Sequence, residues 1–364
     1  MHIRVEKEKI LEIIDHVEGI VEKRNTIPIL SNILIDASSR GLSVTATDLD
    51  IVATDFMTDV EVLENGKTTV AAAIFGALIR KMPSGSQIDM EVANGRMTIK
   101  GGRIRYQIPV LPSDDFPIGK STEGDTIQLS IESVVRAFRL VRDSMSTEES
   151  RYYLNGAFLA IEDESLVAVS TDGHRLSIAQ ISDTKIKQPN AIVPRKAVSE
   201  ILKILPDFEG EMGVTIDERS IRFEIGNLVF TSKLIDGTFP DYTRVVPAGD
   251  RIRIKVNPLL LQQAIERVSI VSSERTSAIR LDIDRDKITI IANNPDTGVA
   301  QEEVAAEANE QISVGYNGRY LRELLNGYQA CENILITLEN ETSPALIRPD
   351  NHEIDRSVLM PMRI

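Results

Sequence analysis

Apolar and polar positions alternate along short stretches of the chain. Residues 103–110 and 221–225 carry an apolar side chain at every second position, and Arg103, Arg105 and Gln107 occupy the intervening positions of the first stretch. Because successive side chains of a strand point to opposite faces, this period of two predicts strands with one buried face.

Other stretches space their apolar residues as a helix does. Residues 134–145 place them on one face and put Arg136 and Arg139 on the opposite face. Asn257-Pro258 is typical of a helix start, since asparagine caps the first turn and proline fits its first position. The pattern predicts six helices, near residues 5–24, 72–83, 131–145, 194–206, 257–275 and 317–330.

A longer repeat divides the chain into three similar parts. The pattern of residues 42–48 returns at 166–172 and, more weakly, at 288–294, at spacings of 124 and 122 positions. A second marker, residues 111–117, returns 123 positions later at 234–240. A repeat of this length has the size of a whole domain.

Three repeats account for the full length of 364 residues. We expect domains over residues 1–122, 126–247 and 251–364, separated by polar, glycine-containing junctions. Two helices and several strands in each predict an α+β fold in which helices pack on antiparallel sheets.

The net charge of −14 argues at first against a nucleic-acid partner. The six predicted helices, however, contain 16 Lys and Arg against 12 Asp and Glu, a net charge of +4, so the rest of the chain carries −18. If the helices share one side of each domain, the protein has a basic face and an acidic back. The alternative is that these cations are ordinary solvated helix residues, as the first helix, with its net charge of −2, suggests.

Composition favours a cytoplasmic protein. Cys331 is the single cysteine, which excludes an internal disulfide and suits a reducing compartment. The N-terminus lacks the apolar stretch of a signal peptide, and no run approaches the roughly 18 apolar residues of a membrane span.

No catalytic, cofactor or metal site is predicted. Residues 119–121 end like a phosphate-binding loop, but Asp114 stands where its first glycine is required. The four histidines are scattered without metal-ligand spacing. Asp172-Gly173-His174 could suggest an Asp-His catalytic pair, yet Asp-Gly more often forms a turn.

Five motifs resemble the bacterial β sliding clamp family, the β subunit of DNA polymerase III. They occur in that family's order and spacing, over residues 151–156, 171–176, 230–234, 239–242 and 360–363. The resemblance implies a DNA-clamp fold of three similar domains and a head-to-tail homodimer. The six-domain ring, with helices lining its hole, would encircle double-stranded DNA independently of sequence. It would tether the DNA polymerase III α subunit, the clamp loader and other proteins with clamp-binding peptide motifs.

The resemblance also assigns residues to a hydrophobic pocket for partner peptides. They are Leu154, Thr171, Gly173, His174, Arg175, Leu176, Pro240, Arg244, Val245, Thr276, Asn317, Tyr320, Val358, Met360, Pro361, Met362 and Arg363. The alternative is that the apolar members belong to an ordinary core. Thr276 stands where some family members have an aromatic residue.

DNA contact and dimerisation are assigned in the same way. The DNA-binding residues would be Arg24, Arg80, Tyr152, Tyr153, Arg195 and Lys196. Ala73, at a position that is basic in some relatives, and Glu148, near the tyrosines, depart from a basic surface. The dimer interface would join Tyr106 and Ile108 of one subunit to Ile270 and Val271 of the other.

Two other functions remain open at this level. A peptide-binding scaffold could share the pocket without forming a ring, and would not remain on circular DNA. A hydrolase that uses His174 would lose turnover on the change His174→Ala, although the sequence offers no nucleophile for it.

Overall fold

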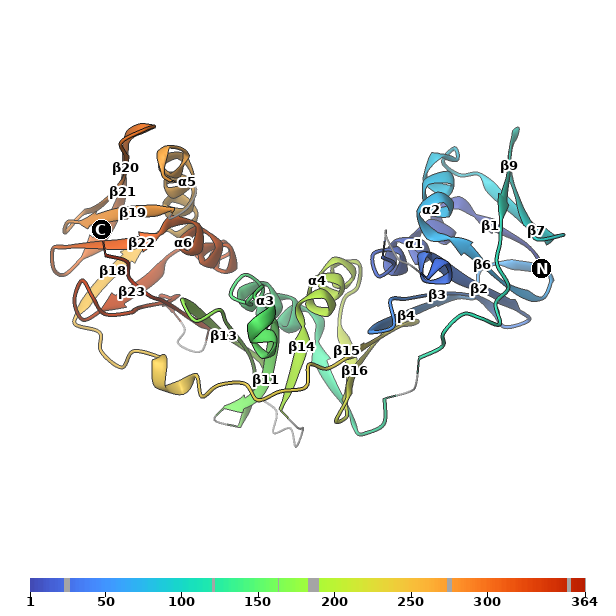
Figure 1. The fold of residues 1–364 in the computed structure, drawn as a ribbon, viewed down its shortest axis with the longest axis horizontal. Coiled ribbons are helices and arrows are strands. Elements are labelled where there is room, and N and C mark those ends of the chain that lie inside the picture. The colour runs from blue at the N-terminus through green and yellow to red at the C-terminus, as the bar shows by residue number, and fades with distance from the viewer. Residues whose placement is uncertain are drawn as a thin grey trace. The chain divides into compact units, whose positions relative to one another are not determined.

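The structure of this chain is a computed structural model that describes residues 1–22, 27–119, 122–162, 164–182, 190–273, 277–351 and 355–363. These residues form two compact units. Unit 1 contains residues 1–131 and 199–234, and unit 2 contains residues 132–198 and 235–364. Helices and antiparallel sheets build both units (Figure 1).

The described strands of unit 1 form two sheets. The first has the order β5 (Glu61–Glu64), β1 (His2–Glu6), β7 (Gln87–Ala93), β8 (Arg96–Gly101) and β9 (Ile104–Pro109). The second has the order β10 (Thr126–Ser130), β15 (Glu211–Ile216), β16 (Ser220–Ile225), β17 (Leu228–Lys233), β4 (Ile51–Met57), β3 (Gly41–Thr47), β2 (Asn32–Ser38) and β6 (Gly66–Ala71). The predicted alternation is confirmed in both β9 and β16, whose polar positions are more exposed than their apolar ones.

Helices α1 (Lys7–Glu18) and α2 (Ala72–Lys81) lie side by side in unit 1, and α1 also packs on β3 and β4. Two short 3-10 helices, η1 (Pro28–Ser31) and η3 (Leu205–Asp207), complete this unit. The boundary between the units falls within α4 (Arg195–Ile204).

The described strands of unit 2 form one continuous sheet. Its order is β14 (Ala191–Pro194), β11 (Gly156–Glu162), β12 (Ser165–Thr171), β13 (Arg175–Ser182), β25 (Arg356–Leu359), β24 (Ala345–Pro349), β23 (Ile334–Leu338), β18 (Ile252–Val256), β21 (Gly298–Ala308), β20 (Lys287–Asn294), β19 (Ala278–Ile283) and β22 (Ile312–Asn317). Its helical segments are α3 (Ile131–Arg142), α5 (Pro258–Val268), α6 (Gly318–Leu325), η2 (Glu149–Leu154), η4 (Thr243–Val245), η5 (Ser269–Val271) and η6 (Asn326–Tyr328).

The six predicted helices are confirmed in the described residues, but all are shorter than predicted. The first begins at Lys7 because residues 2–6 pair with β7 as a strand. The third ends at Arg142, three residues early, although Met145 is buried as expected. The predicted cap of the fifth helix is present, since the Asn257 side chain accepts a hydrogen bond of 3.0 Å from the Leu260 amide.

The repeated sequence pattern marks equivalent strands. Residues 42–48 contain most of β3, residues 166–172 most of β12, and residues 288–294 most of β20. Each of these is the middle strand of three consecutive antiparallel strands. The same local topology therefore occurs three times along the chain.

The sheets continue across the boundaries of the predicted domains. In unit 1, β17 pairs with β4, and in unit 2, β13 pairs with β25. The second pairing sets Arg175 opposite Leu359 and Leu176 opposite Val358. These pairings supply hydrogen-bond partners to strand edges that would otherwise be open. The β13–β25 pair also brings the 171–176 motif beside the C-terminal segment.

Candidate functional site

The turn between β12 and β13 is built by its own side chains. Gly173 has a φ of +88°, a conformation that favours glycine. The Thr171 hydroxyl donates to the Arg175 carbonyl at 2.6 Å and accepts from the Gly173 amide at 3.1 Å. The Asp172 carboxylate accepts from the amides of His174 and Arg175 at 2.9 and 3.0 Å. The Asp-Gly turn is therefore confirmed.

Arg175 connects this turn to α6. It is a buried residue whose Nε donates to Asp172 Oδ2 at 3.0 Å and whose Nη1 lies 2.7 Å from Glu323 Oε2. The second contact is an ion pair without the alignment of a hydrogen bond. The guanidinium carbon also lies 4.4 Å from the centre of the Tyr320 ring, a cation–π contact.

The same arrangement bears on the hydrolase alternative. Asp172 bonds to Arg175 rather than to the imidazole of His174, so the Asp-His catalytic pair is not formed. The exposed His174 ring instead stacks near Tyr320, with ring centres 6.0 Å apart. Asn317 begins α6 by accepting from the Tyr320 amide at 3.1 Å, which positions that ring.

Three apolar residues of the predicted pocket belong to one buried cluster. Leu154, Leu176 and Val358 pack together with Phe239 and Tyr242. Each of the three is less than 5% exposed, so in this structure they form core as well as the floor of any pocket above them. Pro240, Arg244 and Val245 are exposed at the edge of the cluster.

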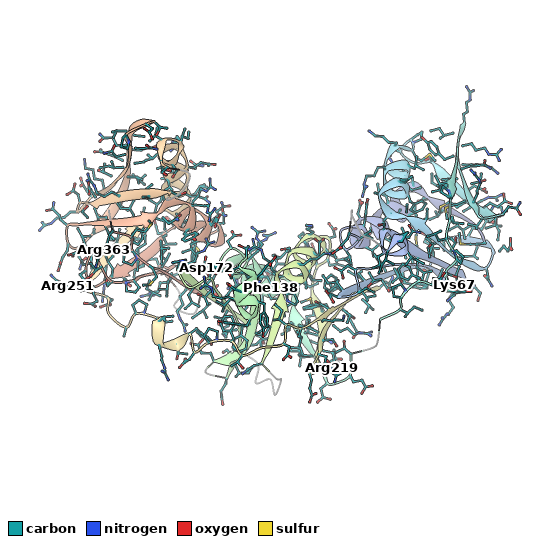
Figure 2. The ribbon with its side chains drawn as sticks, in the orientation of Figure 1. Lys67, Phe138, Asp172, Arg219, Arg251 and Arg363 are labelled. Carbon is teal, nitrogen blue, oxygen red and sulfur yellow. The ribbon has the colours of Figure 1, made fainter. Side chains whose placement is uncertain are left out.

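The C-terminal tail beyond β25 is held by two backbone hydrogen bonds. The amide of Met360 donates to the His174 carbonyl at 3.0 Å, and the amide of Met362 donates to the Gly315 carbonyl at 2.8 Å. Met360 remains 43% exposed. The segment 361–363 lines a concavity of about 980 Å³ over the strands β19 to β22. Figure 2 labels Asp172, in the turn between β12 and β13, and Arg363, in the C-terminal tail.

Most of the predicted pocket residues thus gather where β13, β25 and α6 meet. The segment 361–363 is the exception, because it also faces the separate concavity over β19 to β22. Thr276 lies outside the described residues. Arg151, which was not predicted for the pocket, approaches the 171–175 turn from outside: its Nη1 would lie only 2.9 Å from a Cβ placed on Gly173.

The predicted DNA residues differ in how free their charges are. Arg80 pairs with Asp15 at 2.5 Å and with Glu18, and these partners raise its pKa. Arg195 donates to the Met145 carbonyl at 3.2 Å. Tyr152 is 55% exposed and its ring lies edge-on to that of Tyr153.

Three further residues bear on the predicted contact with DNA. Arg24 lies outside the described residues. Arg139 is exposed on α3, opposite that helix's buried face, as its helical spacing predicted, and it was not assigned to DNA. Glu148 is paired with Arg151 at 2.6 Å, so its charge is partly neutralised.

The residues predicted for the dimer interface lie on accessible elements. Tyr106 and Ile108 are half-buried on β9, which pairs only with β8 among the described strands. Ile270 in η5 is 80% exposed, and Val271 beside it is half-buried. Residues 298–305 of β21 pair with β20 on one side only, among the strands that the structure describes.

Within the described ranges, no cluster of three or more histidine, cysteine or acidic side chains could hold a metal ion. Nor does any helix there have the length and apolar character needed to cross a membrane.

Comparison with known proteins assigns the whole chain. Three family models match: DNA polymerase III beta subunit, N-terminal domain, over residues 1–120; central domain, over residues 128–241; and C-terminal domain, over residues 243–363. The beta sliding clamp of Pseudomonas putida is 34% identical over 369 residues, and that of Escherichia coli K12 is 33% identical over 367, with all of each chain covered.

A solved structure agrees. The crystal structure of the Bartonella birtlesii DnaN sliding clamp, bound to griselimycin, superposes with a TM-score of 0.94 at 37% identity, covering all of both chains. The chain therefore belongs to the DNA polymerase III beta subunit family, the bacterial DNA sliding clamps, which serve replication as processivity factors and not as enzymes.

Proposed function

We propose that this clamp works as a head-to-tail homodimeric ring around duplex DNA and binds the polymerase α subunit, the clamp loader and other partners through peptides in the pocket at β13, β25 and α6. The observation that carries the ring is a pair of complementary strand edges within one chain. Among the described strands, β9 has an open edge next to Arg103 and Arg105, and residues 298–305 of β21 have an open edge with Glu302 and Glu303. Within one copy these glutamates pair with Arg267 and Lys287, so the arginines of the partner would share carboxylates that are already partly neutralised.

Edges of opposite charge favour pairing between two copies. Opposite charges facing each other across strands stabilise a pair, whereas like charges destabilise it. Because the two edges lie on different elements of the same chain, each copy would offer β9 to its partner's β21 in a head-to-tail contact. Such contacts form a ring when the rotation between copies closes, and we propose closure with two copies. The exposed Ile270 would contribute apolar area to that interface.

Charge reversal tests the ring. We expect the variant Arg103→Glu, Arg105→Glu to sediment as a folded monomer at micromolar concentration, since acidic edges would face each other. Adding Glu302→Arg and Glu303→Arg should restore the dimer. The control Arg219→Glu changes an exposed charge elsewhere in unit 1 and should leave the dimer intact. A dimer that persists in the first variant would refute this interface.

The peptide pocket rests on a second set of observations. A buried apolar floor of Leu154, Leu176 and Val358 is bordered by the exposed Met360 and by polar groups of the 171–175 turn. Apolar pockets with a few oriented polar groups are typical of binding sites, and methionine adapts to several ligands. Partner peptides with two hydrophobic side chains fit this chemistry.

Removal of residues 360–364 tests the pocket. β25 ends at Leu359, so the deletion leaves the pairing of β25 with β13 and β24 in place. It removes the tail with its two backbone hydrogen bonds to His174 and Gly315. We expect a chain that folds and dimerises but no longer binds a labelled peptide carrying two hydrophobic side chains in a fluorescence-anisotropy titration. Binding within a few-fold of the intact protein would refute the pocket, and loss of the dimer would show that the tail is structural.

A further inference from the structure

One short element serves both of the sites proposed above. The 3-10 helix η2 carries Tyr152 and Tyr153, assigned to DNA, and ends at Leu154, which lies in the pocket floor. Tyr152 is exposed, whereas Tyr153 is half-buried and packs against the apolar cluster of that floor. Two ligands that bind the two sides of η2 would therefore act on the same six residues.

The helix η2 is held at its ends but broken in its middle. At its start the Arg151 amide donates to the Glu148 carbonyl at 3.2 Å. At its end the Leu154 carbonyl accepts from the Ser146 amide and the Tyr152 carbonyl accepts from the Asn155 amide, both at 3.0 Å. Between these anchors, Arg151 has φ −117° and ψ 48°, which are not helical angles. Short 3-10 segments have poor hydrogen-bond geometry and gain their order from their surroundings. A ligand on either side can therefore supply part of that order.

Arg151 connects η2 to the turn that forms the pocket rim. Its Nε donates to Glu148 Oε2 at 2.8 Å and its Nη2 lies 2.6 Å from the same oxygen. Its Nη1 faces Gly173, where an added Cβ would come within 2.9 Å. The guanidinium thus spans the space between the start of η2 and the turn of His174.

The tyrosines connect η2 to the other side of the pocket. A Cβ placed on Gly237 would lie 3.1 Å from the Cβ of Tyr153 and 3.6 Å from the ring of Tyr152. Gly237 precedes Phe239 and Tyr242, both members of the pocket cluster. A displacement of either tyrosine would consequently act on the segment 237–242 as well as on Leu154.

We propose that η2 couples the two sites, so that duplex DNA at Tyr152 and Tyr153 raises the affinity of the pocket for a hydrophobic peptide, with Arg151 as the positioning residue. This inference rests on the proposed function and adds that binding at one of its two sites regulates binding at the other. A segment that is ordered by the first ligand costs less to order for the second, and this makes the two binding events mutually favourable. Thermodynamic linkage requires the peptide to strengthen DNA binding by the same factor.

The test is a peptide titration of the full-length protein with and without DNA. The probe is the same labelled peptide with two hydrophobic side chains, and the second ligand is a short blunt-ended duplex with its own label at low ionic strength. We expect the peptide Kd to fall about fivefold once the duplex anisotropy is saturated, within the usual range for coupled sites. The coupling ratio is the peptide Kd without DNA divided by the peptide Kd with DNA. The change Arg151→Ala should reduce this ratio to about one, while the protein still binds each ligand alone.

A matched control distinguishes the loss of Arg151 as a positioning residue from the loss of any one ion-paired arginine. Arg253 pairs with Asp250 three positions away, as Arg151 does with Glu148, but it lies on β18 far along the chain. The change Arg253→Ala should keep the fivefold ratio. If the duplex and the peptide both bind the unaltered protein and the ratio is one, the coupling is refuted and the proposed function stands. If either ligand fails to bind at all, the site assignment itself is wrong and the coupling fails with it.

Discussion

At the scale of single residues, Arg175 stabilises the centre of the candidate pocket. Its side chain is 7% exposed and lies between Asp172 and Glu323, which are themselves 14% and 27% exposed. A buried cation between two carboxylates contributes little compared with a well-packed apolar residue, but its removal takes from both carboxylates their nearest cation. Asp172 would keep its two backbone amides, and Glu323 only the more distant Arg319 at 4.0 Å. The pocket rim and α6 therefore depend on one guanidinium.

The change Arg175→Ala should lower the free energy of unfolding of unit 2 by about 3 kcal/mol, because two partly buried carboxylates would lose the cation that lies between them. Denaturation by guanidinium chloride, followed by circular dichroism, measures it. Arg253→Ala, which removes an exposed partner of Asp250, should change stability by less than about 0.5 kcal/mol. Equal losses in the two variants would contradict this role for Arg175.

At the scale of elements, His16 joins α1 to two other segments of unit 1. Its Nδ1 lies 2.6 Å from Asp55 Oδ2 on β4, and its Nε2 lies 3.6 Å from Asp207 Oδ2 in η3. Burial alone lowers the pKa of this imidazole, but the hydrogen bond and charge of Asp55, together with the charges of Asp207 and Glu12, outweigh it and raise the pKa.

The raised pKa predicts a dependence of stability on pH. The protonated His16 stabilises the folded state fully below the ordinary histidine pKa of about 6.5, and this contribution is lost as pH rises through the higher folded pKa. Urea unfolding of unit 1 between pH 6 and 8, a range around that ordinary value, should show decreasing stability. His16→Gln should be less stable at the acidic end and nearly independent of pH. A variant with the pH dependence of the original protein would exclude His16 as its source.

At the scale of the whole molecule, the acidic chain keeps several cations on its helices. Arg139 is exposed on α3, and Arg195 and Lys196 begin α4. Contacts of lysine and arginine with phosphates are independent of base sequence and weaken as salt rises. A closed ring would then stay on DNA because it encircles the duplex, and not because it binds the duplex tightly.

Retention on circular DNA measures this directly. Clamp loaded on a nicked circular plasmid should remain bound through gel filtration and should leave when the plasmid is cut once. The variant Arg139→Ala, Arg195→Ala, Lys196→Ala should load less well at low salt, with a flatter salt dependence, and should still dimerise. Equal retention on linear and circular DNA would support the peptide-binding scaffold instead of the ring.

The apolar part of the interface gives a separate prediction. The variant Ile270→Ala, Val271→Ala should weaken each of two identical interfaces by about 2–4 kcal/mol, the usual cost of truncating buried aliphatic residues. Analytical ultracentrifugation should then show folded monomer at micromolar concentration. An unchanged dimer would place the interface away from η5.

The sequence alone determined the features that depend on local periodicity and on repetition. Six helices, the alternating strands β9 and β16, the Asn257 cap and the Asp-Gly turn follow from side chains close together in the chain, and the threefold repeat follows from comparing distant segments. The first helix was predicted to begin too early because local propensity does not register that residues 2–6 pair with β7 as the strand β1.

Only the tertiary structure decided which side chains meet. The β13–β25 pairing, the contacts of Arg175 with Asp172 and Glu323, and the approach of Arg151 to Gly173 join residues by strand register and side-chain direction. The same holds for the neutralised charge of Arg80 and for the burial of Leu154 and Leu176 in a core. A one-residue shift in the β13–β25 register would turn Arg175 and Leu176 to the other face of the sheet, and no local pattern specifies the register between strands so far apart in sequence.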